Sequence, residues 1–128
     1  MRRGLVGSLA GVLLLCLRVV GAMAATDTTV ETMQIGGEAR SYRVHLPAAD
    51  DGPYPIVFSF HGFNSNAEQE ERLSRFSTLA DRKGFIAVYP EGVDAKWRFM
   101  GRSDADVSFT MAIIDGLAAR LPIDRKRI

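Results

Sequence analysis

The pattern of apolar and polar residues changes partway along the chain. Residues 41–46 alternate between the two kinds, which is typical of a strand with one face in water, and His45 stands on the polar side. A second short run, residues 33–35, comes earlier, and Gly36 and Gly37 provide a turn between the two, so we predict a β-hairpin. We expect His45 to be a solvated surface residue. The polar, threonine-rich residues 25–32 are expected to form a loose leader.

Two later segments, residues 56–60 and 85–89, are nearly continuous apolar runs. Such runs are typical of strands in a parallel sheet whose two faces are both covered by helices. Between them we predict one helix that ends at about Lys83 and begins with a capping box made by Ser65 and Glu68. Its apolar face is expected to consist of Leu73, Phe76, Leu79 and Ala80.

A second helix is predicted from about Asp104 onward, and Pro122 ends it. The stripe that it is expected to bury consists of Val107, Met111, Ile114, Ala118 and Leu121. The order strand, helix, strand, helix predicts an α/β fold with an open sheet. Residues 123–128 have the character of an approach to another strand.

The first 24 residues have the features of a secretory signal peptide. Arg2 and Arg3 give a positive start, residues 5–17 are apolar, and Ala22-Met23-Ala24 offers a cleavage site. We therefore expect a signal peptide over residues 1–24 and secretion into the extracellular or periplasmic space, with no stable membrane anchor. A lipid anchor at Cys16 and a retained membrane anchor are the alternatives. Cleavage would remove Cys16, the single cysteine, so the mature chain would form no disulfide.

The composition limits the class of protein. The 128 residues are 47% hydrophobic and 24% charged, which fits at most one domain. A formal net charge of +1 predicts no nucleic-acid partner, and the short basic cluster at residues 125–127 does not form a basic stripe. Glu68, Glu70 and Glu71 are better explained as residues favoured by the dipole at a helix start than as a metal site. We expect no metal and no cofactor.

The residues best suited to chemistry are His61, Gly62, Phe63 and Asn64, which directly follow the first buried strand. A loop in that place lies at the carboxyl edge of the sheet, where open α/β folds bind ligands. Gly62 would allow close approach of the backbone, and the following N–H groups could face a developing oxyanion. The alternative is an ordinary strand-to-helix turn in which His61 is hydrogen-bonded to the backbone.

A wider set of residues favours the first of these two interpretations, a loop that takes part in chemistry. In chain order it consists of residues 42–47, residues 55–58 leading into His61-Gly62, residues 79–92, Trp97, Asp106-Val107 and residues 121–124. This set resembles the secreted polyhydroxybutyrate depolymerase and feruloyl esterase group of α/β-hydrolases. The resemblance covers about residues 40–128, and residues 79–92 are its most specific part.

The resemblance implies the amino-terminal half of a doubly wound, mostly parallel sheet with an N-terminal β-hairpin. It also implies a serine hydrolase that cleaves esters of hydroxyalkanoate polymers, short acyl esters, or acyl and feruloyl groups on polysaccharide. By position, the backbone N–H of Phe63 would be an oxyanion donor, with His61 and Gly62 shaping the loop. Asn64 and Trp97 are candidates for the substrate cleft; an aromatic cover over the core is the other interpretation of Trp97.

The catalytic triad itself has no match in this sequence. The order in this fold is Ser, then Asp or Glu, then His, and the Ser lies in a G-x-S-x-G turn after a strand that should begin near Ile128. No G-x-S-x-G occurs in the chain, so we expect the triad beyond Ile128. The nearest match surrounds Ser103, which is better explained as a helix N-cap with Asp106 at the third helical position.

We therefore divide the chain into a signal peptide (1–24), a leader with the first strand (25–39) and an incomplete α/β-hydrolase domain (40–128). The expected function is that of a secreted ester hydrolase that is inactive as this fragment alone. The alternatives are a non-catalytic binding protein and a degenerate remnant of such a hydrolase. Because an apolar strand at 56–60 would lack a neighbour, we expect the isolated chain to fold poorly or to self-associate.

Overall fold

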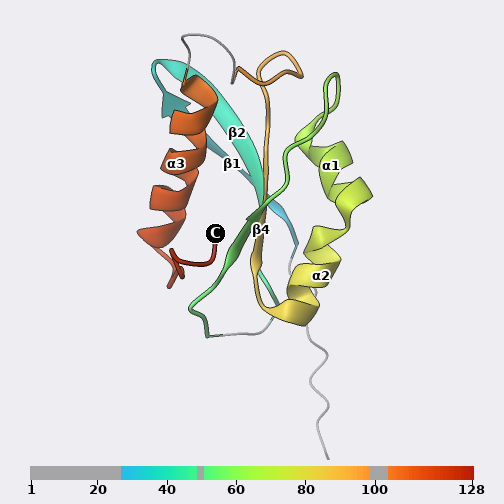
Figure 1. Ribbon diagram of the computed structural model, residues 1–128, viewed down its shortest axis with the longest axis vertical. Helices are drawn as coiled ribbons and strands as arrows, with labels where there is room; N and C mark the ends of the chain where they lie inside the picture. The colour runs from blue at the N-terminus through green and yellow to red at the C-terminus, as the bar shows by residue number, and fades with distance from the viewer. Residues whose placement is uncertain (1–26, 49–50, 99–103) are drawn as a thin grey trace, which may run out of the picture.

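The computed structural model describes residues 27–48, 51–98 and 104–128. Within these residues, one four-stranded sheet is covered by three helices (Figure 1). The strands are β1 (Thr29–Ile35), β2 (Glu38–His45), β3 (Ile56–Phe58) and β4 (Ile86–Pro90), in the sheet order β1-β2-β4-β3. The helices are α1 (Ala67–Ser74), α2 (Phe76–Lys83) and α3 (Ala105–Ala118). The β3–β4 pair is parallel, whereas β2 pairs antiparallel with both β1 and β4.

The hairpin prediction is confirmed, but β1 is longer than expected. Gly36 and Gly37 both adopt positive φ angles, 58° and 84°, as a two-residue hairpin turn requires. The strands pair from Ile35 opposite Glu38 back to Thr29 opposite Val44. The prediction of a loose leader is therefore wrong from Thr29 onward. The backbone of this polar segment pairs with β2, and as an edge strand it can leave polar side chains in water.

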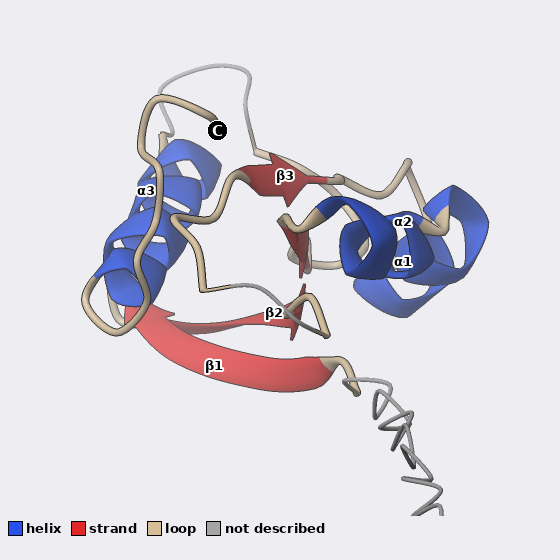
Figure 2. Ribbon diagram, turned by 90° about the horizontal axis from the view of Figure 1, so that it is seen from below, coloured by secondary structure: helices blue, strands red, loops and turns tan. Residues whose placement is uncertain are grey.

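Helices cover both faces of the sheet, as the apolar runs predicted. In Figure 2, α3 lies on one side of the strands and α1 with α2 on the other. Every residue of β4 is buried. Alternate side chains along β4 point to opposite faces of the sheet. Ile86 and Val88 pack in a cluster with α3, whereas Ala87 and Tyr89 pack in a cluster with α1 and α2. This two-layered covering confirms the α/β fold class.

The single helix predicted before Lys83 is in fact two. Arg75 adopts a left-handed conformation, φ 57°, and its N–H closes α1 on the carbonyl of Glu71 at 3.1 Å. The break turns α2 so that Phe76, Leu79 and Ala80 pack on the sheet, while Leu73 is 78% exposed. The predicted capping box is also wrong, because the N-cap is Asn66, which accepts from the Gln69 N–H at 2.9 Å.

The predicted buried stripe of α3 is wrong at Val107 and Met111, which are 58% and 51% exposed. Ile114 is buried, and Leu121 packs against the core, as predicted. The face against the sheet consists of Asp106, Phe109, Ile113 and Leu117. This helix is apolar on several sides, so spacing alone did not reveal which side would face the core. The start of α3 also differs from the prediction, because Asp104 occupies the N-cap position without a side-chain capping bond and Ser103 lies outside the described residues.

His45 is not a solvated residue, contrary to the prediction. It is 4% exposed, and its Nε2 lies 2.9 Å from Oδ1 of Asp81 on α2. The polar side of β2 thus faces a helix that supplies a partner for the imidazole.

The last residues run beside β3. The Tyr54 N–H donates to the carbonyl of Pro122 at 2.7 Å, and the Ile56 N–H donates to that of Arg127 at 3.0 Å. Tyr54 and Ile123 form a parallel bridge. The predicted approach to a strand therefore lies parallel to β3, along the edge that faces away from β4.

The predicted signal peptide lies outside the described residues, as does Cys16. Among the helices that the structure describes, none combines the length and apolar character needed to cross a bilayer.

Candidate active site

The candidate loop, residues 61–64, leaves the sheet at the carboxyl end of β3. Pairing with β4 continues past Phe58, since the Ser59 N–H donates to the carbonyl of Val88 at 2.9 Å. The loop then leads into α1. Glu91, which follows β4, accepts the Ala67 N–H at 3.0 Å and so holds the start of α1 against this edge. Two strand ends and a helix start therefore fix the loop.

The side chain of His61 has a structural role here. It is 2% exposed, its Nδ1 lies 2.8 Å from the carbonyl oxygen of Gly62, and its Nε2 lies 3.0 Å from the Gly92 nitrogen. Because the Gly92 N–H donates, Nε2 must accept, and Nδ1 carries the proton of a neutral imidazole. Both ring nitrogens are thus bound to backbone. This matches the alternative of an ordinary turn as far as the imidazole is concerned.

The side chain of Trp97 packs against His61. Its Nε1 donates to the carbonyl of His61 at 2.8 Å, and the two rings are 4.7 Å apart. Gly92 makes this approach possible, because a Cβ there would lie 2.4 Å from the carbonyl oxygen of Lys96 and 3.1 Å from Nε2 of His61. The sequence prediction that Trp97 and His61 share one edge of the sheet is therefore correct, and residues 92–97 form a cover over the imidazole.

Among the described residues, three backbone N–H groups of the loop have no hydrogen-bond partner, those of His61, Gly62 and Phe63. A turn from Gly62 to Ser65 is closed by a 3.2 Å hydrogen bond, and Asn64, with φ 58°, donates its N–H to Ala95 at 3.0 Å. A Cβ at Gly62 would meet nothing within 4 Å, so the space beside its Cα is open. The Phe63 N–H, which the resemblance indicated, is thus one of the unpaired donors of the loop.

An apolar cavity of about 420 Å³ lies beside the loop. Its lining residues are Phe60, Trp97, Asp106, Val107, Thr110 and Met111. The Phe60 and Trp97 rings meet edge to face at 5.2 Å. Trp97 therefore lines this cavity, and Asn64 is not among its lining residues. Sequence reasoning missed Phe60, Val107 and Met111 because it counted them as core; their exposure could not be deduced from periodicity.

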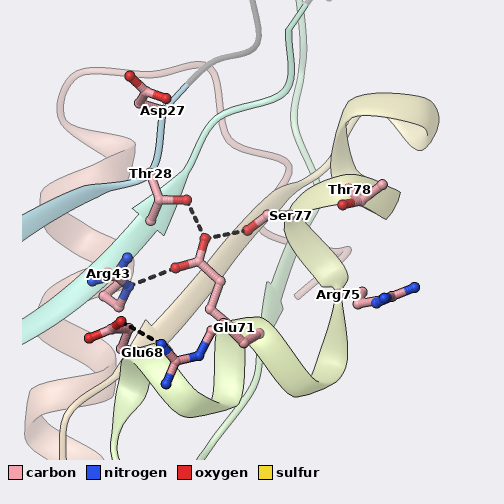
Figure 3. A pocket seen from close by; sticks show the side chains of 9 residues that line it. Asp27, Thr28, Arg43, Glu68, Glu71, Arg75, Ser77 and Thr78 are labelled. Carbon is pink, nitrogen blue, oxygen red and sulfur yellow. Dashed lines mark hydrogen bonds and ion pairs between the residues drawn. The ribbon is translucent and has the colours of Figure 1, made fainter.

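A second, polar cavity of about 730 Å³ lies on the side of α1 and α2 (Figure 3). At its centre, Glu71 accepts hydrogen bonds from Thr28, from Arg43 Nε at 2.7 Å and from Ser77 at 2.8 Å. Burial acts to raise the pKa of Glu71, but these hydrogen bonds and the Arg43 charge outweigh it and lower the pKa below its ordinary value. Glu71 is thus a saturated structural carboxylate. Among the described residues, no group of three or more His, Cys, Asp or Glu could hold a metal ion.

The fold is that of an α/β-hydrolase in part: a mixed sheet covered on both faces, with a glycine-containing loop after a parallel strand. The sequence model of the family described as "Esterase PHB depolymerase" matches residues 40–120. This is more than half of the chain, and the chain belongs to that family.

Two curated sequences are similar to it. NocK of Nocardia uniformis subsp. tsuyamanensis, which bears the name of an esterase, is 32% identical over 113 residues, covering 80% of this chain and 33% of NocK. The bifunctional acetylxylan esterase/xylanase XynS20E of Neocallimastix patriciarum is 30% identical over 94 residues, covering 72% of this chain and 14% of XynS20E. The chain thus spans a third or less of the length of these relatives.

Solved structures show the same fold. The S-formylglutathione hydrolase FrmB of Staphylococcus aureus superimposes with a TM-score of 0.59 at 15% identity, covering 80% of this chain and 44% of FrmB. A cold-adapted esterase from an Arctic intertidal metagenomic library gives a TM-score of 0.61 at 13% identity, covering 77% of this chain and 47% of that esterase. At these identities the likeness concerns the fold alone, and it confirms the α/β-hydrolase architecture.

Proposed function

We propose that this chain supplies the oxyanion-binding part of a secreted, serine-type carboxylic ester hydrolase. The observation that carries the proposal is the Phe63 N–H, which has no partner among the described residues and follows Gly62, where a Cβ would meet nothing within 4 Å. His61 and Trp97 support it indirectly, because their hydrogen bonds hold the backbone on either side of Gly62. A donor fixed in advance stabilises the transition state without reorganising.

In the proposed reaction, a serine oxygen attacks the ester carbonyl carbon and passes its proton to a histidine. The carbonyl oxygen becomes an oxyanion bound by the Phe63 N–H. Collapse expels the alcohol, which takes the proton, and water then releases the acid from the acyl-enzyme by the same steps. The serine, histidine and acid are proposed to come from polypeptide outside these 128 residues. The segment 122–127, which runs parallel to β3, supports the view that a further strand would pair there and lead to the serine.

The proposed substrates are hydroxyalkanoate polymers or acylated polysaccharide. The description of the family supports the first, and the name of XynS20E supports the second. The apolar cavity beside Trp97 suits the carbon chain or ring of an acyl group better than a charged group. The predicted signal peptide supports export of the protein to the outside of the cell, where such polymers occur.

A pair of substitutions at residue 63 tests the oxyanion role. Phe63 is the second residue of the Gly62–Ser65 turn, a position that accepts proline. Phe63→Pro removes the N–H, while Phe63→Ala keeps it and removes the same ring. In an enzyme completed by the remainder of the reading frame, Phe63→Pro should lower kcat on p-nitrophenyl esters by about 100-fold or more. Phe63→Ala should change it only a few-fold. Equal effects of the two variants would refute the oxyanion role.

The proposed origin of the nucleophile has its own tests. The DNA beyond codon 128 should encode an apolar strand followed by G-x-S-x-G; a well-supported stop codon would favour a binding protein or a remnant instead. The purified 128-residue chain should neither hydrolyse short esters nor react with a fluorophosphonate probe. Labelling of the chain by that probe would show that the nucleophile lies within it.

A further inference from the structure

His45 is a buried side chain that the proposed ester chemistry does not use. Its Nε2 lies 2.9 Å from Oδ1 of Asp81, and its Nδ1 lies 3.1 Å from Oγ1 of Thr28, just before β1. The same Asp81 oxygen also accepts the Ala48 N–H at 3.2 Å, so it acts as an acceptor. Nε2 of His45 must therefore carry a proton and donate it to Asp81.

The protons of the Thr28 network determine the state of the other ring nitrogen. The hydroxyl of Thr28 has one proton, which it donates to Oε1 of Glu71. Glu71 has no proton to return, because Arg43 and Ser77 also donate to it and its pKa is lowered. Oγ1 of Thr28 can therefore only accept from Nδ1 of His45. Both ring nitrogens then carry protons.

We propose that His45 is a proton-binding site, occupied as an imidazolium that fastens the start of β1 to α1 and α2. One side of the ring binds Asp81 of α2, and the other reaches Glu71 of α1 through Thr28 (Figure 3 shows the Thr28–Glu71–Arg43 part). The charged groups beside the ring have both signs: the carboxylates of Asp81 and Glu71 and the guanidinium of Arg43. Glu68, Arg72 and Arg75 line the same polar cavity.

Other groups around the ring fit this assignment. Asp27, which precedes Thr28, also lines the polar cavity and adds negative charge on that side. The residue opposite His45 on β4 is Ala87, which brings no charge. Tyr89 of β4 meets the network only through Ser77, at 2.9 Å, and burial raises the pKa of Tyr89, so it stays neutral.

Loss of the proton would weaken the fastening. A neutral imidazole keeps one N–H, which Asp81 holds, so Nδ1 would become an acceptor. The single proton of Thr28 would then be needed by both His45 and Glu71, and one of the two hydrogen bonds would be lost. The start of β1 should therefore loosen as the pH rises.

The other histidine provides an internal reference. Nε2 of His61 accepts from the Gly92 N–H at 3.0 Å, while Oε1 of Glu91 lies farther away, at 3.4 Å. Hydrogen bonding therefore assigns this ring one proton, on Nδ1, which faces the carbonyl of Gly62. Nitrogen-15 NMR of the side chains distinguishes an imidazolium from a neutral ring. At a pH of about 7.5, roughly one unit above the ordinary imidazole midpoint, His45 should show two protonated nitrogens and His61 one. A neutral His45 in that spectrum would overturn the proposal. If the chain self-associates, magic-angle spinning of the sedimented protein gives the same readout.

Variants of the network test the proton count directly. In Glu71→Gln the amide can donate to Thr28, whose proton then turns to Nδ1, so His45 should be neutral at the same pH. The control is Glu68→Gln, which changes an exposed carboxylate of the same helix and should leave the imidazolium.

A second variant, Thr28→Val, removes the acceptor of Nδ1 with little change in size. Without that acceptor, His45 should show one protonated ring nitrogen in the same spectrum. An unchanged His45 in both Glu71→Gln and Thr28→Val would overturn the proposal.

Discussion

Arg40 of β2 and Asp106 of α3 form a 2.8 Å ion pair whose side chains are only 2% and 8% exposed. The guanidinium also donates to the carbonyl of Glu91 at 3.1 Å and lies 4.2 Å from the centre of the Phe109 ring. The second oxygen of Asp106 accepts the backbone N–H of Arg98. One buried pair thus joins the hairpin, the start of α3 and the segment that carries Trp97.

Removing one partner of this pair should be costly. Asp106→Asn leaves the Arg40 charge buried without compensation, and such changes lower the free energy of unfolding by about 3–5 kcal/mol. The matched control is Asp115→Asn, which breaks an exposed pair of the same length with Arg125 and should cost less than about 1 kcal/mol. Urea denaturation of both variants measures the difference. Similar losses in the two would mean that burial does not decide the strength of the pair.

Two glycines near the candidate loop should respond differently to alanine. A Cβ at Gly92 would lie 2.4 Å from the carbonyl oxygen of Lys96, a contact that backbone cannot relieve cheaply, whereas a Cβ at Gly62 would meet nothing within 4 Å. We expect Gly92→Ala to destabilise the fold by more than about 1 kcal/mol and to displace Trp97 from His61. Gly62→Ala should leave stability nearly unchanged. Tryptophan fluorescence during thermal unfolding reports both effects, and a harmless Gly92→Ala would contradict the cover arrangement.

Local patterns in the sequence predicted the elements that depend on local physics. Gly36 and Gly37 supply the positive φ angles of the hairpin turn, and the runs at 56–60 and 85–89 reflect burial on two faces. These features depend on residues close in sequence or on composition alone. For that reason the fold class and the place of the His61 loop could both be predicted.

The errors arose where a distant partner decides the outcome. His45 is buried because Asp81, 36 residues away, meets it, and no spacing rule reveals that contact. The break at Arg75 has no glycine or proline to mark it; packing of Phe76 on the sheet selects it. On α3, Asp106 faces the sheet because it forms an ion pair with the buried Arg40 of β2, although a charged residue at a helix start is usually solvated.

Tyr42 should make stability fall at alkaline pH. Burial, followed by the hydrogen bond and the charge of Glu31, raises the pKa of Tyr42 to about 12. A group whose pKa is raised on folding stabilises the protein fully below its unfolded value of about 10, and that contribution is lost as the pH rises toward 12. The free energy of unfolding should therefore decline between these values. In Tyr42→Phe this part of the decline should disappear, as measured by urea denaturation along the pH range. An unchanged slope in Tyr42→Phe would assign the decline to other groups.

The apolar side of α3 and the edge of β3 should make the 128-residue chain self-associate. Phe60, Val107 and Met111 are 45%, 58% and 51% exposed around one cavity. Residues 122–127 lie along the start of the outer edge of β3, where Ile56 bonds to Arg127. Among the described residues, none pairs with Val57 or Phe58 on that side. An exposed strand edge next to apolar surface favours association between copies.

Gel filtration with light scattering tests this expectation. The unmodified chain should elute as a dimer or larger species, and Val107→Gln combined with Met111→Gln should shift it toward the monomer. Leu73→Gln is the control, because Leu73 is even more exposed, at 78%, but lies on α1, on the other face of the sheet. It should leave the elution unchanged. A monomeric parent chain, or equal effects of the two sets of substitutions, would show that this surface needs no covering partner.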